Sequence, residues 1–94
     1  MQEILSAHLL TGRSSGSLNR LGYSFLYEHL YDVAIFVFKE NVKMFPESAN
    51  AYDSLGEAYM RKGEKDLAKE NFRKSLTLDP NNTNAKEMLI ELSK

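Results

Sequence analysis

The sequence contains no cysteine, and this absence removes a whole group of chemistries. Without a thiol the chain cannot form a disulfide, use a thiolate as a nucleophile or offer sulfur ligands to zinc. It also lacks an excess of charge of one sign, since twelve Lys and Arg residues stand against thirteen Asp and Glu residues. Proteins that bind nucleic acid usually carry a basic surface, so this balance argues against a nucleic-acid partner.

Long hydrophobic runs are missing as well. No apolar stretch approaches the ~20 residues that a membrane-spanning helix needs, so we expect no membrane contact. Residues 1–5 also lack the basic flank that begins a secretion signal. The chain as written is therefore expected to be soluble, and cytoplasmic if it is complete, although its compartment stays unknown.

The side chains that catalysis requires are few. His8 and His29 are too far apart in the sequence to form a metal-binding pair on one helix. The small residues of 12–16 lack the lysine-serine end of a phosphate-binding loop. Glu28, His29 and Asp32 could be read as an acid–base cluster, but they fall at a predicted turn. The sequence therefore predicts no enzyme, no catalytic residue, no metal and no cofactor.

What the sequence does contain is an internal repeat with a period of 34 residues. When residues 15–48 are placed on residues 49–82, five of the six identical positions hold large apolar, very small or helix-ending residues, whereas chance would scatter the matches over the polar positions as well. A period of this length is typical of stacked helical units. The identical pairs are Leu21 and Leu55, Gly22 and Gly56, Asp32 and Asp66, Ala34 and Ala68, Phe38 and Phe72, and Pro46 and Pro80.

The second copy of the repeat predicts two helices, over 49–61 and 65–78, because its apolar residues recur at helical spacing. Ser48 is placed to cap the first of them, and Gly63 can take the left-handed conformation that ends it. Pro80 ends the second helix. The copy is therefore a helical hairpin.

The first copy predicts the same hairpin, over 17–28 and 31–44, but the turn around His29 has no glycine. A further helix over 83–93 has one apolar side. Residues 1–11 also have a helical pattern, and could be the remnant of an earlier hairpin, an independent helix or a frayed end. The predicted organisation is an N-terminal helix and linker over 1–14, repeats over 15–48 and 49–82, and a capping helix over 83–94.

These matched residues resemble the pattern of the tetratricopeptide repeat. The resemblance implies an all-α fold in which antiparallel helical hairpins stack into a right-handed superhelix, a solenoid that acts as a protein-binding scaffold. We expect Gly22 and Gly56, with Ala34 and Ala68 opposite them, to let the helices approach closely. Asn41 departs from the pattern, since a small residue is usual at its position. The residues that carry the resemblance are Leu18, Leu21, Gly22, Phe25, Ala34, Phe38 and Pro46 in the first copy, and Tyr52, Leu55, Gly56, Tyr59, Ala68, Phe72, Ser75 and Pro80 in the second.

In such a stack the first helix of each hairpin lines a concave face, where a partner is expected to bind. Amides there can bond a peptide backbone, tyrosines offer flat apolar contact, and carboxylates favour a basic or amphipathic protein or peptide. A merely solvated surface would have a similar composition. The candidate residues are Asn19, Tyr23, Tyr27, Asn50, Asp53, Glu57, Arg61, Asn84, Glu87 and Glu91.

Some members of the family clamp the acidic tails of heat-shock chaperones with lysine, arginine and asparagine side chains. The resemblance places five residues of this chain at those positions, and none of them is a cation, so this use is not expected. The five residues are Asn19, Tyr23, Ser54, Asn84 and Met88.

A second surface is suggested by Ile35, Phe36 and Val37, which are apolar where the second copy has Lys69, Glu70 and Asn71. No single amphipathic stripe accounts for three consecutive apolar residues, so something should cover them. A second copy of the chain, a neighbouring domain, or the N-terminal segment could do so. Cover by a second copy would make the chain a dimerisation element, and cover by a neighbouring domain would make it a regulatory appendage of a larger, hydrolase-like protein. Cover by the N-terminal segment would need no partner. The apolar residues of the N-terminal segment are Ile4, Leu5, Leu9 and Leu10.

Overall fold

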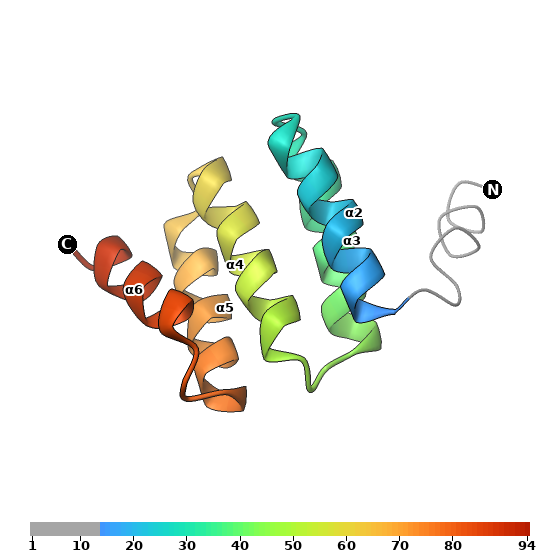
Figure 1. Ribbon diagram of the computed structural model, residues 1–94. Helices are drawn as coiled ribbons and strands as arrows, with labels where there is room; N and C mark the ends of the chain where they lie inside the picture. Colours follow the sequence, from blue (N-terminus) through green and yellow to red (C-terminus); the bar gives the residue numbers. More distant parts are fainter. Residues whose placement is uncertain (1–13) are drawn as a thin grey trace.

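The computed structural model describes residues 14–94, and within this range the chain forms five α-helices and no strand. Two helical hairpins stand side by side, and the last helix packs against the second hairpin (Figure 1). The predicted all-α repeat fold is confirmed, whereas the helix predicted over 1–11 lies outside the described residues. The helices are α2 (Ser15–Tyr27), α3 (Tyr31–Met44), α4 (Ala49–Lys62), α5 (Lys65–Leu78) and α6 (Thr83–Leu92).

Three helices begin at capping residues spaced by 34 positions. The side chains of Ser14, Ser48 and Asn82 each accept a hydrogen bond from the backbone N–H three residues further on, at 3.1, 3.1 and 3.2 Å. Each bond satisfies an N–H that the first turn of a helix leaves without a partner. The same local signal therefore starts α2, α4 and α6.

The turns inside the two hairpins share one backbone conformation in spite of different residues. Gly63 has a φ of 95°, and His29, its counterpart 34 positions earlier, has a φ of 62°. Glycine adopts this left-handed region without cost, while a side chain makes it less favourable. His29 Nδ1 lies 2.9 Å from the hydroxyl of Tyr31, which holds the ring at the turn.

Within each hairpin a phenylalanine ring lies directly against a glycine of the first helix. A Cβ added to Gly22 would lie 2.2 Å from the ring of Phe38, and one added to Gly56 would lie 2.9 Å from that of Phe72. Both rings are fully buried. The alanines of the pattern, Ala34 and Ala68, are also fully buried, and their place opposite the glycines stays a prediction.

Asn41 is accommodated in the core although a small residue is usual at its position. It is fully buried, and its Nδ2 donates to the carbonyl oxygen of Ser15 at 3.3 Å. Ser75, 34 positions later, donates to the carbonyl oxygen of Ala49 at 2.7 Å. In each hairpin a polar side chain of the second helix therefore binds the first residue of the first helix.

The prediction of an outer surface at Ile35, Phe36 and Val37 needs correction. Ile35 and Val37 are only 8% and 5% exposed, and Val37 packs against Leu18 of α2. Phe36 is 39% exposed. The helices of the chain itself thus cover two of the three residues, because α3 is packed both by α2 and by α4. Within residues 14–94, no helix is long and apolar enough to cross a bilayer.

Candidate protein-binding face

The first helices α2, α4 and α6 carry the predicted binding residues in rows that follow the 34-residue interval. We call these ten residues the first-helix face. Because equivalent positions of stacked repeats lie beside one another, each row runs across neighbouring helices. The rows are Asn19, Asp53 and Glu87; Tyr23, Glu57 and Glu91; Tyr27 and Arg61; and Asn50 and Asn84.

Tyr23 is the centre of a hydrogen-bonded group that joins α2 to α4. Its hydroxyl donates to Glu57 Oε1 at 3.0 Å, and Glu57 Oε2 lies 3.1 Å from the guanidinium of Arg61. Burial is the main cause that raises the pKa of Tyr23, and the negative charge of Glu57 raises it further. The hydroxyl therefore stays protonated and donates. Tyr27, which is 65% exposed, lies against Tyr23 with ring centroids 5.8 Å apart.

Asp53 is a half-buried carboxylate held by two amides. Asn84 Nδ2 donates to one carboxylate oxygen at 2.8 Å, and Asn82 Nδ2 donates to the other at 3.1 Å. Burial raises the pKa of Asp53, while the two amide hydrogen bonds act in the opposite direction. Among residues 14–94, no lysine or arginine forms an ion pair with Asp53. The Asp53 carboxylate is thus partly desolvated, and no lysine or arginine of the described residues pairs with it.

The other predicted residues are placed less tightly. Asn19 accepts a hydrogen bond from the buried hydroxyl of Ser54, which ties α2 to α4 a second time. Glu91 pairs with Lys94 at 3.0 Å, so part of its charge is offset at the end of the chain. Asn50 and Glu87 are exposed. Seven of the ten residues therefore form one group, in which they lie side by side or are joined by hydrogen bonds, an ion pair or ring contact. The other three, Asn50, Glu87 and Glu91, lie at the margin of this group.

Ser54 and Asn82 support this face, and the sequence analysis did not single out either for such a role. Asn82 caps α6 and also donates from Nδ2 to Asp53 and to the hydroxyl of Ser75, the latter at 2.8 Å. A signal existed for Asn82, because it lies 34 positions after the predicted capping residue Ser48. The 34-residue interval did not indicate Ser54, because its partner Asn19 lies 35 positions earlier.

The charge of the first-helix face is mainly negative. Four of its residues, Asp53, Glu57, Glu87 and Glu91, are acidic, and Arg61 is its one basic residue. Arg61 is already paired with Glu57. Such a surface can attract cations on a partner, and the tyrosines add apolar area.

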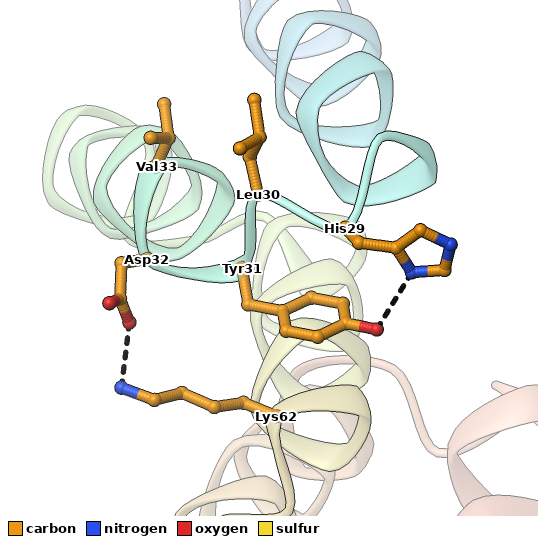
Figure 2. A pocket seen from close by; sticks show the side chains of 6 residues that line it. All are labelled: His29, Leu30, Tyr31, Asp32, Val33 and Lys62. Atoms are coloured by element: carbon orange, nitrogen blue, oxygen red, sulfur yellow. Dashed lines mark hydrogen bonds and ion pairs between the residues drawn. The ribbon is translucent and has the colours of Figure 1, made fainter.

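A separate hollow of about 380 Å³ lies at the turn of the first hairpin, outside the first-helix face. Leu30 and Val33 point side by side in one direction, while Asp32 points the other way and forms an ion pair with Lys62 at 2.6 Å (Figure 2). The hydrogen bond to Asp32 raises the pKa of Lys62. The hollow is lined by His29, Leu30, Tyr31, Asp32, Val33 and Lys62.

Comparison with known families decides what kind of repeat this is. Residues 49–82, the second hairpin, match the family model of the tetratricopeptide repeat. The chain carries a tetratricopeptide repeat. The first hairpin has the same helices and caps at the same interval, and the bounds predicted for its repeat, 15–48, stay a prediction, as do those of the cap, 83–94.

Relatives and solved structures agree with the repeat. The chain is 41% identical over 64 residues, 68% of its length, to the tetratricopeptide repeat domain-containing protein PYG7, chloroplastic, of Arabidopsis thaliana, and it spans 21% of that protein. It resembles a chain of the APC/C hetero-tetramer Cut9–Hcn1 with a TM-score of 0.80 at 22% identity, over 85% of this chain and 15% of that one. The first TPR of Spaghetti (RPAP3), bound to the HSP90 peptide SRMEEVD, gives a TM-score of 0.51 at 18% identity, over 84% of this chain and 90% of that one.

Tetratricopeptide repeats are generally modules for protein interaction and not for catalysis. That this chain has no enzymatic activity, no cofactor and no nucleic-acid partner stays a prediction. Its compartment also stays open.

Proposed function

We propose that this tetratricopeptide chain is a protein-interaction module whose first-helix face binds a peptide or a helix that carries basic residues. The observation that supports this most directly is Asp53, a half-buried carboxylate that has two amide donors and no cation among the described residues. A lysine or arginine of a partner would supply the missing charge, and a charge-assisted hydrogen bond is stronger than a neutral one.

The neighbours of Asp53 suit a peptide. Tyr23 and Tyr27 present flat, partly apolar surface at the α2 side, and large rigid aromatic side chains contribute strongly to protein interfaces. The amides of Asn50 and Asn84 are exposed and can bond a peptide backbone. Because Tyr23, Glu57 and Asp53 are already held by hydrogen bonds, less side-chain freedom is lost when a partner binds.

The peptide of the Spaghetti structure, SRMEEVD, is acidic. The five positions at which the family resemblance places lysine, arginine or asparagine for such a tail carry no cation in this chain, and Asp53 and Glu57 would repel a second set of carboxylates. The charge of the first-helix face therefore favours the opposite kind of partner.

Two peptides of equal length test the proposal. One is SRMEEVD, and the other has both glutamates and the aspartate replaced by lysine. Backbone amide NMR shifts of the full chain would be followed during titration with each. The lysine peptide should shift signals of α2, α4 and α6, and bind at least about tenfold more tightly, which corresponds to about 1.4 kcal/mol. Equal affinities, or shifts confined to α3 and α5, would overturn the proposal.

A pair of charge reversals provides the matched control. Glu57→Lys reverses a charge on the first-helix face, while Glu70→Lys makes the same change on an exposed part of α5. The first variant should lose at least about tenfold in affinity for the lysine peptide, and the second should stay within about twofold of the wild type. Tyr23→Ala should also weaken binding. Circular dichroism must show unchanged helicity in all three, and equal losses in both charge variants would contradict the assignment of the face.

A further inference from the structure

An apolar stripe runs along the outer side of α3, on a different surface from the first-helix face. Leu30, Val33, Phe36 and Met44 are 48%, 42%, 39% and 43% exposed. In the second hairpin the equivalent positions are Glu64, Leu67, Glu70 and Leu78, of which two are charged. The second hairpin has the same fold but a more polar surface at these positions. The repeat fold itself therefore does not require the apolar stripe.

The four residues share one side of the helix. At 100° per residue, Leu30, Val33, Phe36 and Met44 fall within about 120° of one another around the α3 axis. Charged residues follow one edge of this stripe, acidic at the start of the helix and basic near its end. Asp32 is 81% exposed and Lys43 is 77% exposed. Glu40 lies between Phe36 and Met44 on this side, is 30% exposed and pairs with Lys43 at 3.7 Å. The stripe is therefore apolar from Leu30 to Phe36 and again at Met44, and it has opposite charges at its two ends.

We propose that a second copy of this chain covers the stripe, with the two α3 helices packed antiparallel about a twofold axis near Phe36. In this arrangement the start of each α3 faces the end of the other. Leu30 meets Met44 of the second copy, and the two Phe36 rings meet near the axis. The result is an isologous dimer in which each contact occurs twice.

Charge complementarity favours a second copy as the occupant. When a twofold axis relates two antiparallel helices, the axis is perpendicular to both of them. The charged edge of one helix then lies on the same side of the contact as the charged edge of the other. Asp32, which pairs with Lys62 in its own chain, then faces Lys43 of the second copy, which pairs with Glu40 there, so that opposite charges alternate across the contact at both ends. The opposed helix dipoles add a favourable term. Parallel packing about a twofold axis would instead put the two charged edges on opposite sides of the contact, where they cannot pair.

Shape supports the same arrangement. The hollow at the turn of the first hairpin lies at one end of the stripe and includes Leu30, Val33 and Asp32 in its lining (Figure 2). Met44, at the other end, is a flexible apolar side chain that adapts to irregular spaces. In the dimer each Met44 enters the hollow of the second copy, while Lys43 approaches Asp32 there.

Two matched substitutions test the dimer by sedimentation velocity of the full chain. Val33 and its counterpart Leu67 are 42% and 40% exposed, so Val33→Glu and Leu67→Glu place the same charge at equivalent positions. The wild type should be a dimer. Val33→Glu should weaken the dimer at least about tenfold, because it puts a charge into an apolar contact, whereas Leu67→Glu should leave the dimer unchanged.

Engineered cysteines test the register, since the chain has no cysteine of its own. Residues 30 and 44 are about 21 Å apart along one helix at 1.5 Å per residue, too far for a disulfide within one chain. The double variant Leu30→Cys with Met44→Cys should form covalent dimers on oxidation, as should Phe36→Cys alone. Met44→Cys alone should not, because the two copies of residue 44 lie at opposite ends.

Each remaining outcome would overturn the proposal. A wild type that stays monomeric at about 1 mM concentration excludes a useful dimer. A dimer that Val33→Glu and Leu67→Glu affect equally uses another surface. A monomer in which NMR shows contacts from residues 1–13 to Phe36 and Met44 would assign the stripe to the chain's own N-terminal segment.

Discussion

Gly22 and Gly56 occupy equivalent places in the two hairpins, but they differ in the room they leave for a side chain. A Cβ would lie 2.2 Å from the Phe38 ring in the first hairpin and 2.9 Å from the Phe72 ring in the second. Because both rings are fully buried, neither can move without disturbing the core. The alanine substitution tests this contact directly.

We predict that Gly22→Ala lowers the free energy of unfolding by about 1–3 kcal/mol, and that Gly56→Ala lowers it by less. Urea denaturation followed by circular dichroism measures both. Gly16→Ala is the control, since its Cβ would lie 3.9 Å from the nearest side-chain atom, an ordinary contact. It should be neutral or stabilising. A smaller loss for Gly22→Ala than for Gly56→Ala would contradict the observed packing.

Asp53 gives a second prediction at this scale. Burial raises its pKa in the folded chain, so the folded state holds this proton more tightly than the unfolded state does. The contribution of Asp53 to the free energy of unfolding therefore falls as the pH rises from the ordinary aspartate value of about 3.9 through the raised pKa.

Wild type and Asp53→Ala should be compared by urea denaturation between about pH 3.5 and pH 6.5, a window that spans the ordinary aspartate pKa. Relative to the variant, the wild type should be more stable at the acidic end than at the neutral end. Other carboxylates titrate in both proteins and cancel in the difference. A difference that stays constant, or that grows with pH, would show that burial does not raise this pKa.

At the scale of the elements, the helices that the three capping residues begin are packed against different numbers of neighbouring helices. α4 is packed against α2, α3 and α5, whereas α6 packs mainly against α5. Asn82 caps α6 and is also bound to Asp53 and to Ser75. The last helix therefore depends on its cap more than α4 does.

Asn82→Ala should remove the cap of α6 at a cost of about 1 kcal/mol and increase hydrogen exchange chiefly over residues 83–92. Ser48→Ala removes the corresponding cap of α4. Because α4 lies inside the core, its loss should lower protection throughout both hairpins. Hydrogen exchange with mass spectrometry separates these patterns, and a uniform change in Asn82→Ala would speak against a locally held α6.

For the whole molecule, the main core extends through all five described helices. It includes Leu26 of α2, Phe38 of α3, Leu55 of α4, Phe72 of α5 and Ala85 of α6. Each of these side chains is at most 4% exposed. The two hairpins therefore share one core, as is expected when neighbouring repeats supply each other's interface.

This shared core predicts cooperative unfolding. Leu55→Ala, which removes a side chain packed between the hairpins, should cost about 2–5 kcal/mol and lower the midpoints of far-ultraviolet circular dichroism and tyrosine fluorescence equally. Lys69→Ala on α5 should leave both midpoints nearly unchanged. Separate transitions in the wild type would show that the hairpins unfold independently.

The sequence by itself determined the period, the number of helices after residue 14 and their bounds to within two residues. These features depend on local signals: apolar spacing, capping side chains and residues at turns. The rows of the first-helix face could also be predicted, because positions 34 residues apart, such as Tyr23 and Glu57, become neighbours in any such stack.

The tertiary structure alone decided what lies against each side chain. Ile35 and Val37 are apolar in the sequence whether or not another helix covers them, and the packing of α2 and α4 on α3 settles that they are buried. The same holds for the Phe38 ring at Gly22 and the two amides at Asp53. Sequence spacing fixes the direction of a side chain around its own helix, whereas its contacts depend on where the other helices stand.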